Sequence, residues 1–338
     1  MTYTVYRTAG GRVERQSLPL APLGPTEVRV AVLAAALNFR DLYFIRGNAF
    51  RAPVDGRVPL TDAVGIVEAV GAAVTRFTPG QRVCTTVLPG WIDGPLTAAG
   101  LAGSPGSRDR DGVLAEKISL DQQELVAAPS YLSDSAAATL SVAALTAWHA
   151  VVELDALRAG DTVLIQTTGG VAVFAIQFAA ALGARVIVVS RSDDKLQQAL
   201  ALGAHSAIHS GRTPDWEDQV LQQTGGAGAR LVLDMGLEGS LRRAIRAAAF
   251  EGTVAIIGVV QQESNMLDIF PVMNKNLRVR GVETGSRAMF ERMNAFMAEH
   301  AIEPVVAAEF DAGEIELALD RMAQGPFGKV VVRVAAPC

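Results

Sequence analysis

A pair of glycines directly after an apolar run indicates a site where this chain could bind a ligand. Thr162–Gln166 is an apolar segment of β type, and Gly169-Gly170 follows it just before a helical segment. A strand that enters a glycine turn and then a helix points backbone N–H groups and the positive end of the helix dipole at one spot. The stretch therefore predicts an anion site that suits a pyrophosphate group.

The same stretch departs from the three-glycine dinucleotide fingerprint at two positions. Thr167 stands in the first position and Ala172 in the third. Because a threonine rarely takes a positive φ, we expect the two glycines to allow the close approach of the ligand. Glycine also serves such turns for steric reasons alone, so the pair by itself leaves the nucleotide interpretation open. The predicted phosphate contacts are Thr168, Gly169, Gly170 and Val171.

The residues after the next apolar run indicate which dinucleotide would bind. An NAD-binding fold usually places an acid about 20 residues after the glycines, where it holds the ribose 2′-hydroxyl. Here Arg185–Val189 ends in Ser190 and Arg191, and the acids come later, at the start of a helix. Arg191 and Lys195 can pair with a 2′-phosphate, and a solvated surface arginine is the other interpretation. The pattern favours NADPH over NADH.

From about Ser133 the chain alternates helical and β-type segments. Continuous apolar β-type runs are typical of a parallel sheet that is covered on both faces, so the alternation predicts a doubly wound α/β sheet. Ligands of such sheets bind at the carboxyl ends of the strands. Ser210 either borders the adenine there or lies on the surface. Further residues predicted at that edge are Ser190, Gly236, Gly258 and Val259.

The expected elements follow from these periodicities. The first third is rich in strands and loops, with a helix over Asn38–Arg46 and a long surface loop over Leu88–Asp111. Its expected strands are Glu27–Val32, Ala63–Val70 and Val83–Val87. The later helices are expected at Ala136–Leu154, Val171–Leu182, Asp194–Leu202, Trp216–Gln223 and Leu241–Phe250. The later strands are expected at Thr162–Gln166, Arg185–Ser190, Ala207–His209, Leu231–Gly236, Thr253–Val260 and Leu277–Glu283.

The composition excludes several classes of function. The formal charge of the 338 residues is -5, which gives no general attraction to nucleic acid or to anionic lipid. The two cysteines, Cys84 and Cys338, cannot form a disulfide framework or a cysteine-based zinc site. No apolar segment reaches the roughly 20 residues of a membrane span, and the first residues do not form a signal peptide. We expect a cytoplasmic protein that acts on a small molecule.

Several motifs, in this order along the chain, resemble the medium-chain dehydrogenase/reductase superfamily. They are Ala36-Leu37-Asn38-Phe39-Arg40-Asp41, Gly65–Gly71, Pro79-Gly80-Gln81-Arg82-Val83, Leu145-Thr146-Ala147-Trp148, Thr168-Gly169-Gly170-Val171 and Phe327-Gly328-Lys329-Val330-Val331. The resemblance implies a β-rich, GroES-like catalytic domain (1–126 and 283–338) and a Rossmann dinucleotide-binding domain (127–282). It also implies that the strand near 277–283 pairs across a two-fold axis in a homodimer.

The resemblance argues against a catalytic zinc ion in this chain. The zinc-dependent members bind the ion with Cys, His and Cys, and the matching positions here are Asn38, Thr61 and Val142. None of these side chains is a thiolate or an imidazole, whereas a catalytic zinc needs three protein ligands. The loop Leu88–Asp111 also lacks the cysteines of the structural zinc lobe.

The run Leu37–Asp41 especially resembles the zinc-free members of the superfamily, which include quinone oxidoreductases and enoyl reductases. Enoyl reductases often carry a tyrosine where this chain has Ala49, which argues against a simple enoyl reductase with tyrosine as the proton donor. Tyr43, on the preceding helix, is a catalytic candidate, but its position does not give it the same role. Asn38 is expected to donate to a developing oxyanion near the nicotinamide, or else to cap its helix. The remaining candidates are Thr61 and Asp62, which would face the same site, and Thr146, which would touch the nicotinamide.

These features together predict a zinc-independent, NADPH-dependent reductase of conjugated carbonyls such as quinones and enones. In such a reaction the cofactor carries the hydride, while the protein orients the substrate and stabilises the charge that develops on its oxygen. Two alternatives stay open: a metal-free carbonyl reductase or alcohol dehydrogenase, and an NADPH-binding sensor without turnover. Asp62 has two interpretations, as a proton relay or as a paired acid at the start of a strand.

Overall fold

A strand with alternating polarity organises the β-rich part of the chain. In the computed structural model, which describes residues 2–48, 52–155, 157–258 and 269–334, β3 (Glu27–Ala36) pairs with β4 (Asp62–Val70) and β15 (Lys329–Arg333). Every second side chain in the first part of β3 is buried, as its alternation predicts. Antiparallel pairing with β15 places the last strand of the chain beside an early one.

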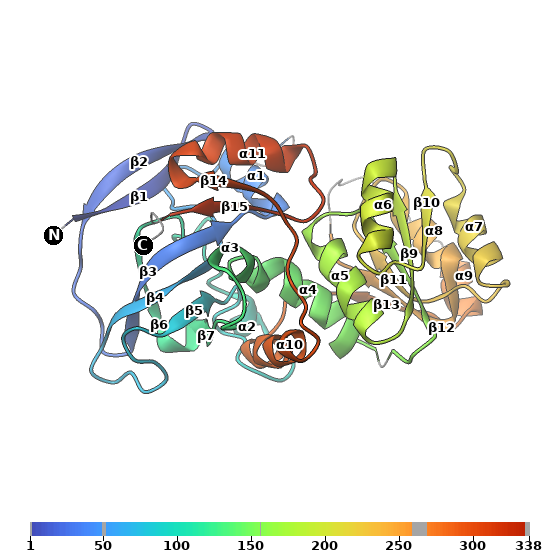
Figure 1. Cartoon of the computed structure of the whole chain (residues 1–338), viewed down its shortest axis with the longest axis horizontal. Coiled ribbons are helices and arrows are strands. Elements are labelled where there is room, and N and C mark those ends of the chain that lie inside the picture. Colours follow the sequence, from blue (N-terminus) through green and yellow to red (C-terminus); the bar gives the residue numbers. More distant parts are fainter. Residues whose placement is uncertain (1, 49–51, 156, 259–268, 335–338) are drawn as a thin grey trace. The chain divides into compact units, whose positions relative to one another are not determined.

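The chain divides into two units, and β3 belongs to the first (Figure 1). Unit 1 comprises Met1–Leu145 and Thr284–Cys338, and unit 2 comprises Thr146–Glu283. The seven-stranded sheet of unit 1 has the order β14-β15-β3-β4-β5-β7, and β6 also pairs with β3. Its other elements are β1 (Thr2–Ala9), β2 (Arg12–Pro19), α1 (Phe39–Arg46), β5 (Arg82–Thr85), α2 (Ala98–Leu101), β6 (Lys117–Asp121), β7 (Leu125–Ala127), α3 (Asp134–Ala137), α10 (Arg287–Glu299), β14 (Val306–Asp311) and α11 (Ile315–Ala323).

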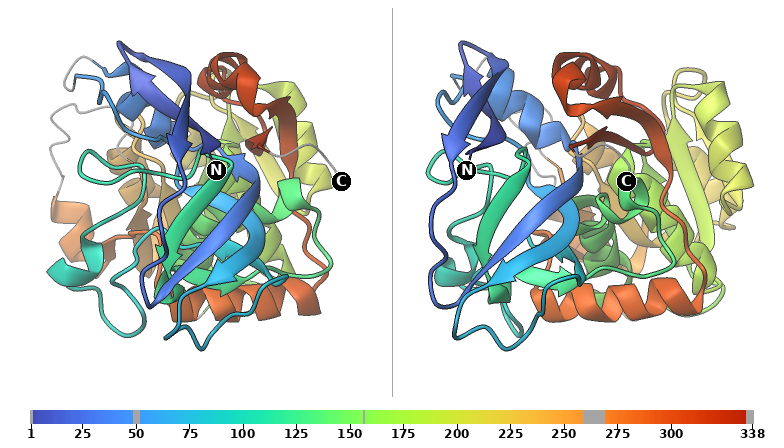
Figure 2. Two further views of the ribbon diagram at one scale, coloured as in Figure 1. Left: turned by 90° about the vertical axis from the view of Figure 1, so that its left-hand side faces the viewer. Right: turned by 60° about the vertical axis from the view of Figure 1, so that its left-hand side comes forward.

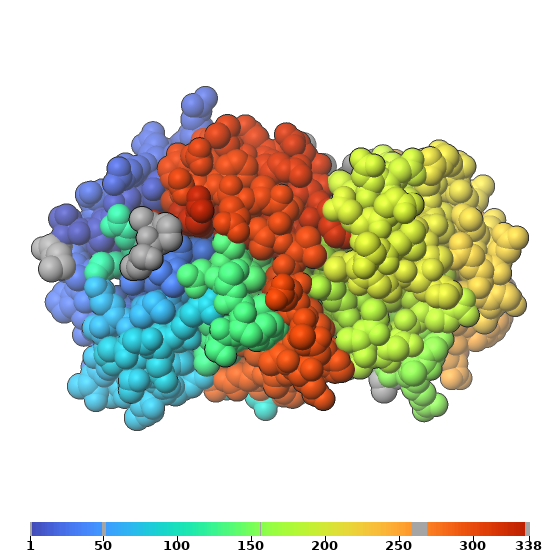
Figure 3. Space-filling model, viewed as in Figure 1, coloured from blue at the N-terminus to red at the C-terminus, as the bar shows by residue number. Residues whose placement is uncertain are grey.

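The C-terminal segment is an integral part of unit 1. Helix α11 packs on β14 and β15, and α10 packs beside β7 at the other edge of the sheet (Figure 2). The space-filling view shows the red C-terminal segment covering part of the surface next to the blue N-terminal strands (Figure 3). Ile315 and Leu319 of α11 join a core that includes Val30 of β3 and Val330 of β15. Helix α11 and strand β15 therefore belong to the same hydrophobic core as the early strand β3.

The first boundary between the units lies later in the chain than the predicted 126/127. Helix α3 contacts β3 and β4, and a π-helical turn at Leu140–Ala144 contacts β4 and β5. These packing contacts keep the residues up to Leu145 in unit 1.

Unit 2 is built on the predicted parallel sheet, with the order β10-β9-β8-β11-β12-β13. Helices α5 and α6 cover one face and α8 lies on the other (Figure 1). The order is that of a doubly wound Rossmann sheet, which confirms the predicted fold class. Helix α4 (Leu145–Trp148) begins with the last residue of the first segment of unit 1 and continues into unit 2. The other elements of unit 2 are β8 (Thr162–Gln166), α5 (Gly170–Ala181), β9 (Arg185–Ser190), α6 (Asp193–Ala201), β10 (Ser206–His209), α7 (Trp216–Gln223), β11 (Ala229–Asp234), α8 (Ser240–Ala247), β12 (Ala248–Ile256), α9 (Ile269–Asn274) and β13 (Arg278–Gly281).

The single helix predicted for Ala136–Leu154 is wrong. Two short α-helices, α3 and α4, alternate there with π-helical turns at Leu140–Ala144 and His149–Glu153. An apolar run has the same composition in α and π geometry, so periodicity alone does not reveal the insertions. Such turns often occur at functional sites, and Val142 lies within the first of them.

The long loop predicted for Leu88–Asp111 is interrupted by the short helix α2, whose N-cap Thr97 accepts a hydrogen bond from the Gly100 N–H. In the described part of the chain, no helix is both long enough and apolar enough to cross a membrane.

Candidate active site

The loop between β3 and α1 presents Asn38. Asn38 is the N-cap residue of α1, and its backbone N–H donates to Asp41 Oδ2 at 2.7 Å, as in a capping box. Immediately before it, the Leu37 N–H donates to the Val330 carbonyl at 2.9 Å. The helix cap and the link to β15 thus hold the backbone on both sides of Asn38.

Lys329, the first residue of β15, directs its ammonium group to Asn38. Its Nζ donates to Asn38 Oδ1 at 2.6 Å and to Asp62 Oδ2 at 3.2 Å. The Lys329 side chain is 3% exposed and that of Asp62 is fully buried. Asn38, Asp62 and Lys329, called the polar triad below, come from three different elements and meet because β15 and β4 both pair with β3.

The polar triad holds buried charges, and two of its polar atoms lack hydrogen bonds. Burial raises the pKa of Asp62, while the charge of Lys329 and the nearby polar groups of Asn38 and Val142 oppose that rise. Asn38 Nδ2 and Asp62 Oδ1 are both buried, yet neither has a hydrogen-bond partner of normal geometry within the described part of the chain. Because such atoms carry a desolvation cost, the triad has capacity for a further hydrogen-bonding ligand.

The other two catalytic candidates of unit 1 do not join the triad. The Thr61 hydroxyl donates to the Pro105 carbonyl at 3.3 Å, and its own carbonyl accepts from Thr85 Oγ1 at 2.9 Å. Tyr43 lies on α1 with its ring edge-on to Phe39 at a centroid distance of 5.3 Å. Of the catalytic candidates predicted in unit 1, the structure therefore brings Asn38 and Asp62 together through Lys329.

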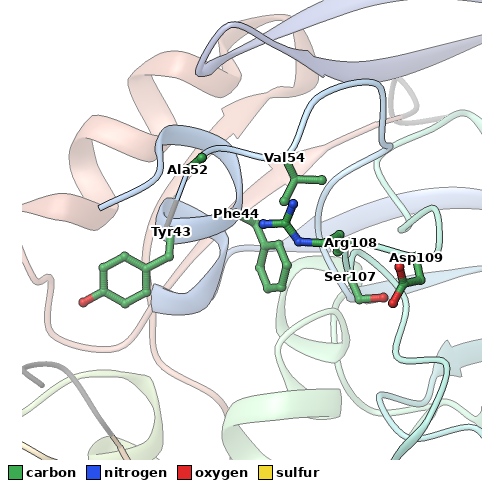
Figure 4. A pocket seen from close by; sticks show the side chains of 7 residues that line it. All are labelled: Tyr43, Phe44, Ala52, Val54, Ser107, Arg108 and Asp109. Atoms are coloured by element: carbon green, nitrogen blue, oxygen red, sulfur yellow. The ribbon is translucent and has the colours of Figure 1, made fainter. Parts of the chain in front are cut away.

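A cavity of about 390 Å³ lies beside α1 in unit 1. In Figure 4 the Arg108 guanidinium lies next to the Phe44 ring, and the Tyr43 ring points away from the other lining side chains. The mixture of aromatic and charged groups suits a substrate with a planar apolar part and a polar end. The cavity is lined by Tyr43, Phe44, Ala52, Val54, Ser107, Arg108 and Asp109.

In unit 2, the predicted phosphate contacts lie where β8 passes into α5. Gly169 is the N-cap residue of α5, and Gly170 begins that helix. A Cβ built on Gly169 would meet nothing within 4 Å, so the space above this turn is open. Helix α5 has 12 residues, and its N-terminal dipole favours an anion in that space.

The conformation of this turn differs from the expected one. Thr167, not a glycine, adopts the positive φ, at 67°, while Gly169 is extended at φ -75°. The Thr167 N–H donates to the Val189 carbonyl at 2.8 Å, which ties the strained residue to β9. A left-handed β-branched residue costs of the order of 1–3 kcal/mol, so the turn keeps the backbone shape of the fingerprint at a cost in stability.

Gln166, the last residue of β8, is a site residue that sequence reasoning missed. It is buried, and both polar atoms of its side chain lack a hydrogen-bond partner in the described part of the chain. It directly precedes the turn at the carboxyl edge of the sheet. A glutamine in an otherwise apolar strand was the available signal, because a buried amide without a partner is rare.

The predicted 2′-phosphate residues follow β9. Arg191 is exposed and forms no hydrogen bond or ion pair with the described residues. Ser192 caps α6 by accepting from the Lys195 N–H, and Asp193 is held by Arg212, whose Nη1 donates to Asp193 Oδ2 at 2.8 Å. The ion pair engages the nearby acid and leaves the Arg191 guanidinium available.

The remaining cofactor candidates are distributed as follows. Ser190, Ser210, Gly236 and Gly258 follow or end strands at the carboxyl edge of the sheet, and the Ser210 N–H donates to the Ser190 carbonyl at 2.9 Å. Thr146 is buried in α4. Val259 lies outside the described residues. The cofactor roles of all these residues stay predictions.

Comparison with known proteins identifies the family. The model of the alcohol dehydrogenase GroES-like domain matches residues 24–130, and that of the zinc-binding dehydrogenase matches residues 170–299. A zinc-type alcohol dehydrogenase-like protein of Schizosaccharomyces pombe is 36% identical over 92% of both chains. The chain belongs to the medium-chain dehydrogenase/reductase superfamily. It is an oxidoreductase of this type, with the GroES-like and Rossmann folds that the resemblance implied.

Two solved structures are similar to this medium-chain dehydrogenase/reductase over nearly its whole length. A putative alcohol dehydrogenase from Sinorhizobium meliloti 1021 is 36% identical, with a TM-score of 0.91 over 98% of both chains. A structure described as an NAD-dependent alcohol dehydrogenase is 33% identical, with a TM-score of 0.88 over 98% of this chain and 100% of the other. Nicotinamide cofactors are thus found in the family, and the open space above Gly169 and the unpartnered Gln166 amide fit such a ligand.

The zinc ion named in some relatives does not fit the residues of this chain. Asn38, Thr61 and Val142, at the positions of the expected ligands, provide an amide, an engaged hydroxyl and an apolar side chain. Within the described ranges, no three His, Cys, Asp or Glu side chains are grouped so that they could hold a metal. The Lys329 ammonium also lies within hydrogen-bond distance of Asn38 and Asp62, and its charge opposes a cation there.

Proposed function

We propose that this protein is a zinc-independent, NADPH-dependent reductase of conjugated carbonyls such as quinones and α,β-unsaturated ketones. The observation that carries the proposal is the polar triad. It offers a buried amide donor beside a fixed ammonium group, at the position where zinc-dependent relatives are expected to bind their metal. Such a donor stabilises an oxyanion without a Lewis acid.

Bound NADPH would supply a hydride to the electron-poor carbon of the substrate and leave as NADP⁺. The electron pair of the conjugated system then moves to the carbonyl oxygen, and a proton from solvent completes the reduction. The residues of this chain act on that oxygen: Asn38 Nδ2 donates a hydrogen bond to it, and Lys329 polarises the amide. Removing one donor of this kind typically lowers kcat by about 10²–10³-fold.

The alternative function is metal-free carbonyl reduction or alcohol oxidation, which the alcohol dehydrogenase names of the relatives favour. Alcohol oxidation requires a base for the hydroxyl proton, and Asp62 is held in an ion pair instead. A panel of quinones, enones, ketones and aldehydes, with NADPH consumption as the readout, decides between these functions. Turnover confined to ketones or aldehydes would refute our proposal, and NADPH binding without any turnover would favour a sensor.

NADPH preference is proposed on the basis of Arg191, although one relative is described as NAD-dependent. Replacing Arg191 by alanine should reduce the NADPH/NADH ratio of kcat/KM about 10- to 150-fold, because a hydrogen bond to a charged group contributes about 1.5–3 kcal/mol. Arg185→Ala is the matched control, since Arg185 is exposed at the opposite end of β9. An unchanged ratio in Arg191→Ala would disprove the assignment.

We also propose a homodimer that forms through the edge strand β13 and the adjoining helix α9. Ile269, Phe270 and Met273 of α9 are each at least 64% exposed, and such apolar groups are expected to be covered by a partner. Light scattering should give twice the monomer mass of 35.5 kDa. Ile269→Asp/Met273→Asp should yield the monomer, whereas Leu317→Asp, at an exposed apolar position of unit 1, should not. A wild-type mass of one chain would contradict the dimer.

A further inference from the structure

The ammonium group of Lys329 determines how the Asn38 amide is oriented. An ammonium group donates hydrogen bonds and accepts none. The amide atom 2.6 Å from Lys329 Nζ is therefore the carbonyl oxygen Oδ1. This contact turns the NH₂ group of Asn38 to the other side of the amide, near enough to the Asp62 carboxylate to oppose the rise of its pKa. Nδ2 nevertheless makes no hydrogen bond of normal geometry in the described part of the chain.

The arrangement differs from a plain buried ion pair. A lysine that served only to neutralise Asp62 would make its shorter contact with the carboxylate. Here the contact to Asn38 Oδ1, at 2.6 Å, is shorter than the contact to Asp62 Oδ2, at 3.2 Å. Asp62 anchors the ammonium group, and the ammonium group in turn polarises the amide, which strengthens the amide N–H donors.

The same geometry opposes a metal ion. A divalent cation bound by Asn38 or Asp62 would lie a few ångströms from the Lys329 charge, in a site that water does not screen. The lysine would also have to release both of its hydrogen bonds. The triad therefore already holds the positive charge that a metal would bring.

We propose that Lys329 is a positioning residue that supplies the fixed positive charge of this site in place of zinc and holds Asn38 Nδ2 ready for the substrate oxygen. The proposal rests on the proposed function, in which Asn38 is the oxyanion donor. It predicts that the losses of kcat from replacing Lys329 and from replacing Asn38 do not add when both residues are replaced.

The test uses variants that keep the site folded. Lys329→Met alone would leave Asp62 buried without its partner, so Lys329→Met/Asp62→Leu removes the whole pair. Thermal unfolding should show that this double variant is folded. Its kcat should fall about as much as that of Asn38→Asp, about 10²–10³-fold, with little change in KM. Adding Asn38→Asp to it should cost no further kcat, because residues that act as a unit are not additive. Lys329→Arg keeps the positive charge and should therefore keep most of the wild-type kcat.

An ion pair with one buried member provides a control far from the polar triad in the sequence. Glu217 and Arg246 are paired at 3.1 Å in unit 2, and Glu217 is buried. Arg246→Met/Glu217→Leu should leave kcat unchanged. A folded Lys329→Met/Asp62→Leu protein with wild-type kcat would overturn the proposal.

The metal content of the purified wild-type protein tests the proposal without relying on turnover. Elemental mass spectrometry should find zinc far below one ion per chain, and one zinc ion per chain would overturn the role of Lys329. If no compound of the panel is reduced, the proposed function fails, and the zinc content still decides whether lysine stands in place of the metal.

Discussion

Replacing Asn38 by aspartate should lower kcat for conjugated carbonyls by about 10²–10³-fold, with KM for NADPH nearly unchanged. Aspartate has the same shape, caps helices well and can still accept from Lys329 Nζ. It lacks the NH₂ group, and its charge lies where charge would develop on the substrate. The loss should therefore fall on the transition state, which a kcat effect without a KM effect reports.

Two variants distinguish the interpretation of Asn38 as an oxyanion donor from its interpretation as a helix cap. Asn38→Ala removes both the donor and the cap, so it should lower kcat and also destabilise the protein by about 0.5–2 kcal/mol. Asn38→Asp removes the donor and keeps a capping side chain, and it also adds a carboxylate near the buried Asp62, so its melting temperature is measured beside its kcat. If Asn38 were only a helix cap, Asn38→Asp would retain activity, and that result would refute the oxyanion role.

The sequence predicted the helices and strands of the protein better than the contacts between distant side chains. Strong periodicity located β3, β8 and β9, because a core face repeats at fixed spacing. It also predicted α7 with the bounds found in the structure, Trp216–Gln223. These elements are local, so their signals are contained in neighbouring residues.

Lys329 shows what a sequence pattern leaves out. It lies 291 residues from Asn38, and only the pairing of β15 with β3 brings the two together. Its motif, Phe327–Val331, marks the family, and nothing within the motif itself indicates a contact with Asn38. A lysine at the start of the apolar run Val330–Val332 was the available signal, because buried lysines are rare unless they are paired.

Thr167 shows a different reason for error. The expectation that a β-branched residue avoids positive φ is sound as a local rule, yet the residue adopts φ 67° here. The hydrogen bond to Val189 and the burial of β8 and β9 outweigh the local preference. Residues held in this way tend to occur at functional sites, which agrees with its place at the start of the predicted phosphate turn.

Asp41 should make the protein less stable as the pH rises from about 4 to about 7. Burial raises the pKa of its fully buried carboxyl from 3.8 to about 6. Between these two values the folded protein holds a proton that the unfolded chain has lost, so stability falls with rising pH. Above the folded pKa the contribution is fully lost. The shift corresponds to about 3 kcal/mol of unfolding free energy.

Asp41→Asn should remove this pH dependence. The asparagine oxygen can still accept from the Asn38 N–H, and no charge has to be buried, although Lys329 loses a nearby negative charge. The variant should therefore gain stability over the wild type as the pH rises, by of the order of 1–3 kcal/mol at pH 8. Urea unfolding at intervals from pH 4 to pH 8 measures it.

A surface acid in the same structural role separates burial from capping. Glu314 accepts from the Asp311 N–H at 3.1 Å in another capping box, and it is exposed. Glu314→Gln reports the loss of a capping acid at the surface, and its effect should not reproduce the gain of Asp41→Asn at pH 8. A stability difference between Asp41→Asn and the wild type that stays constant from pH 4 to pH 8 would refute the burial argument. The stability lost at neutral pH would then have to come from a group other than the acid that holds the backbone of Asn38.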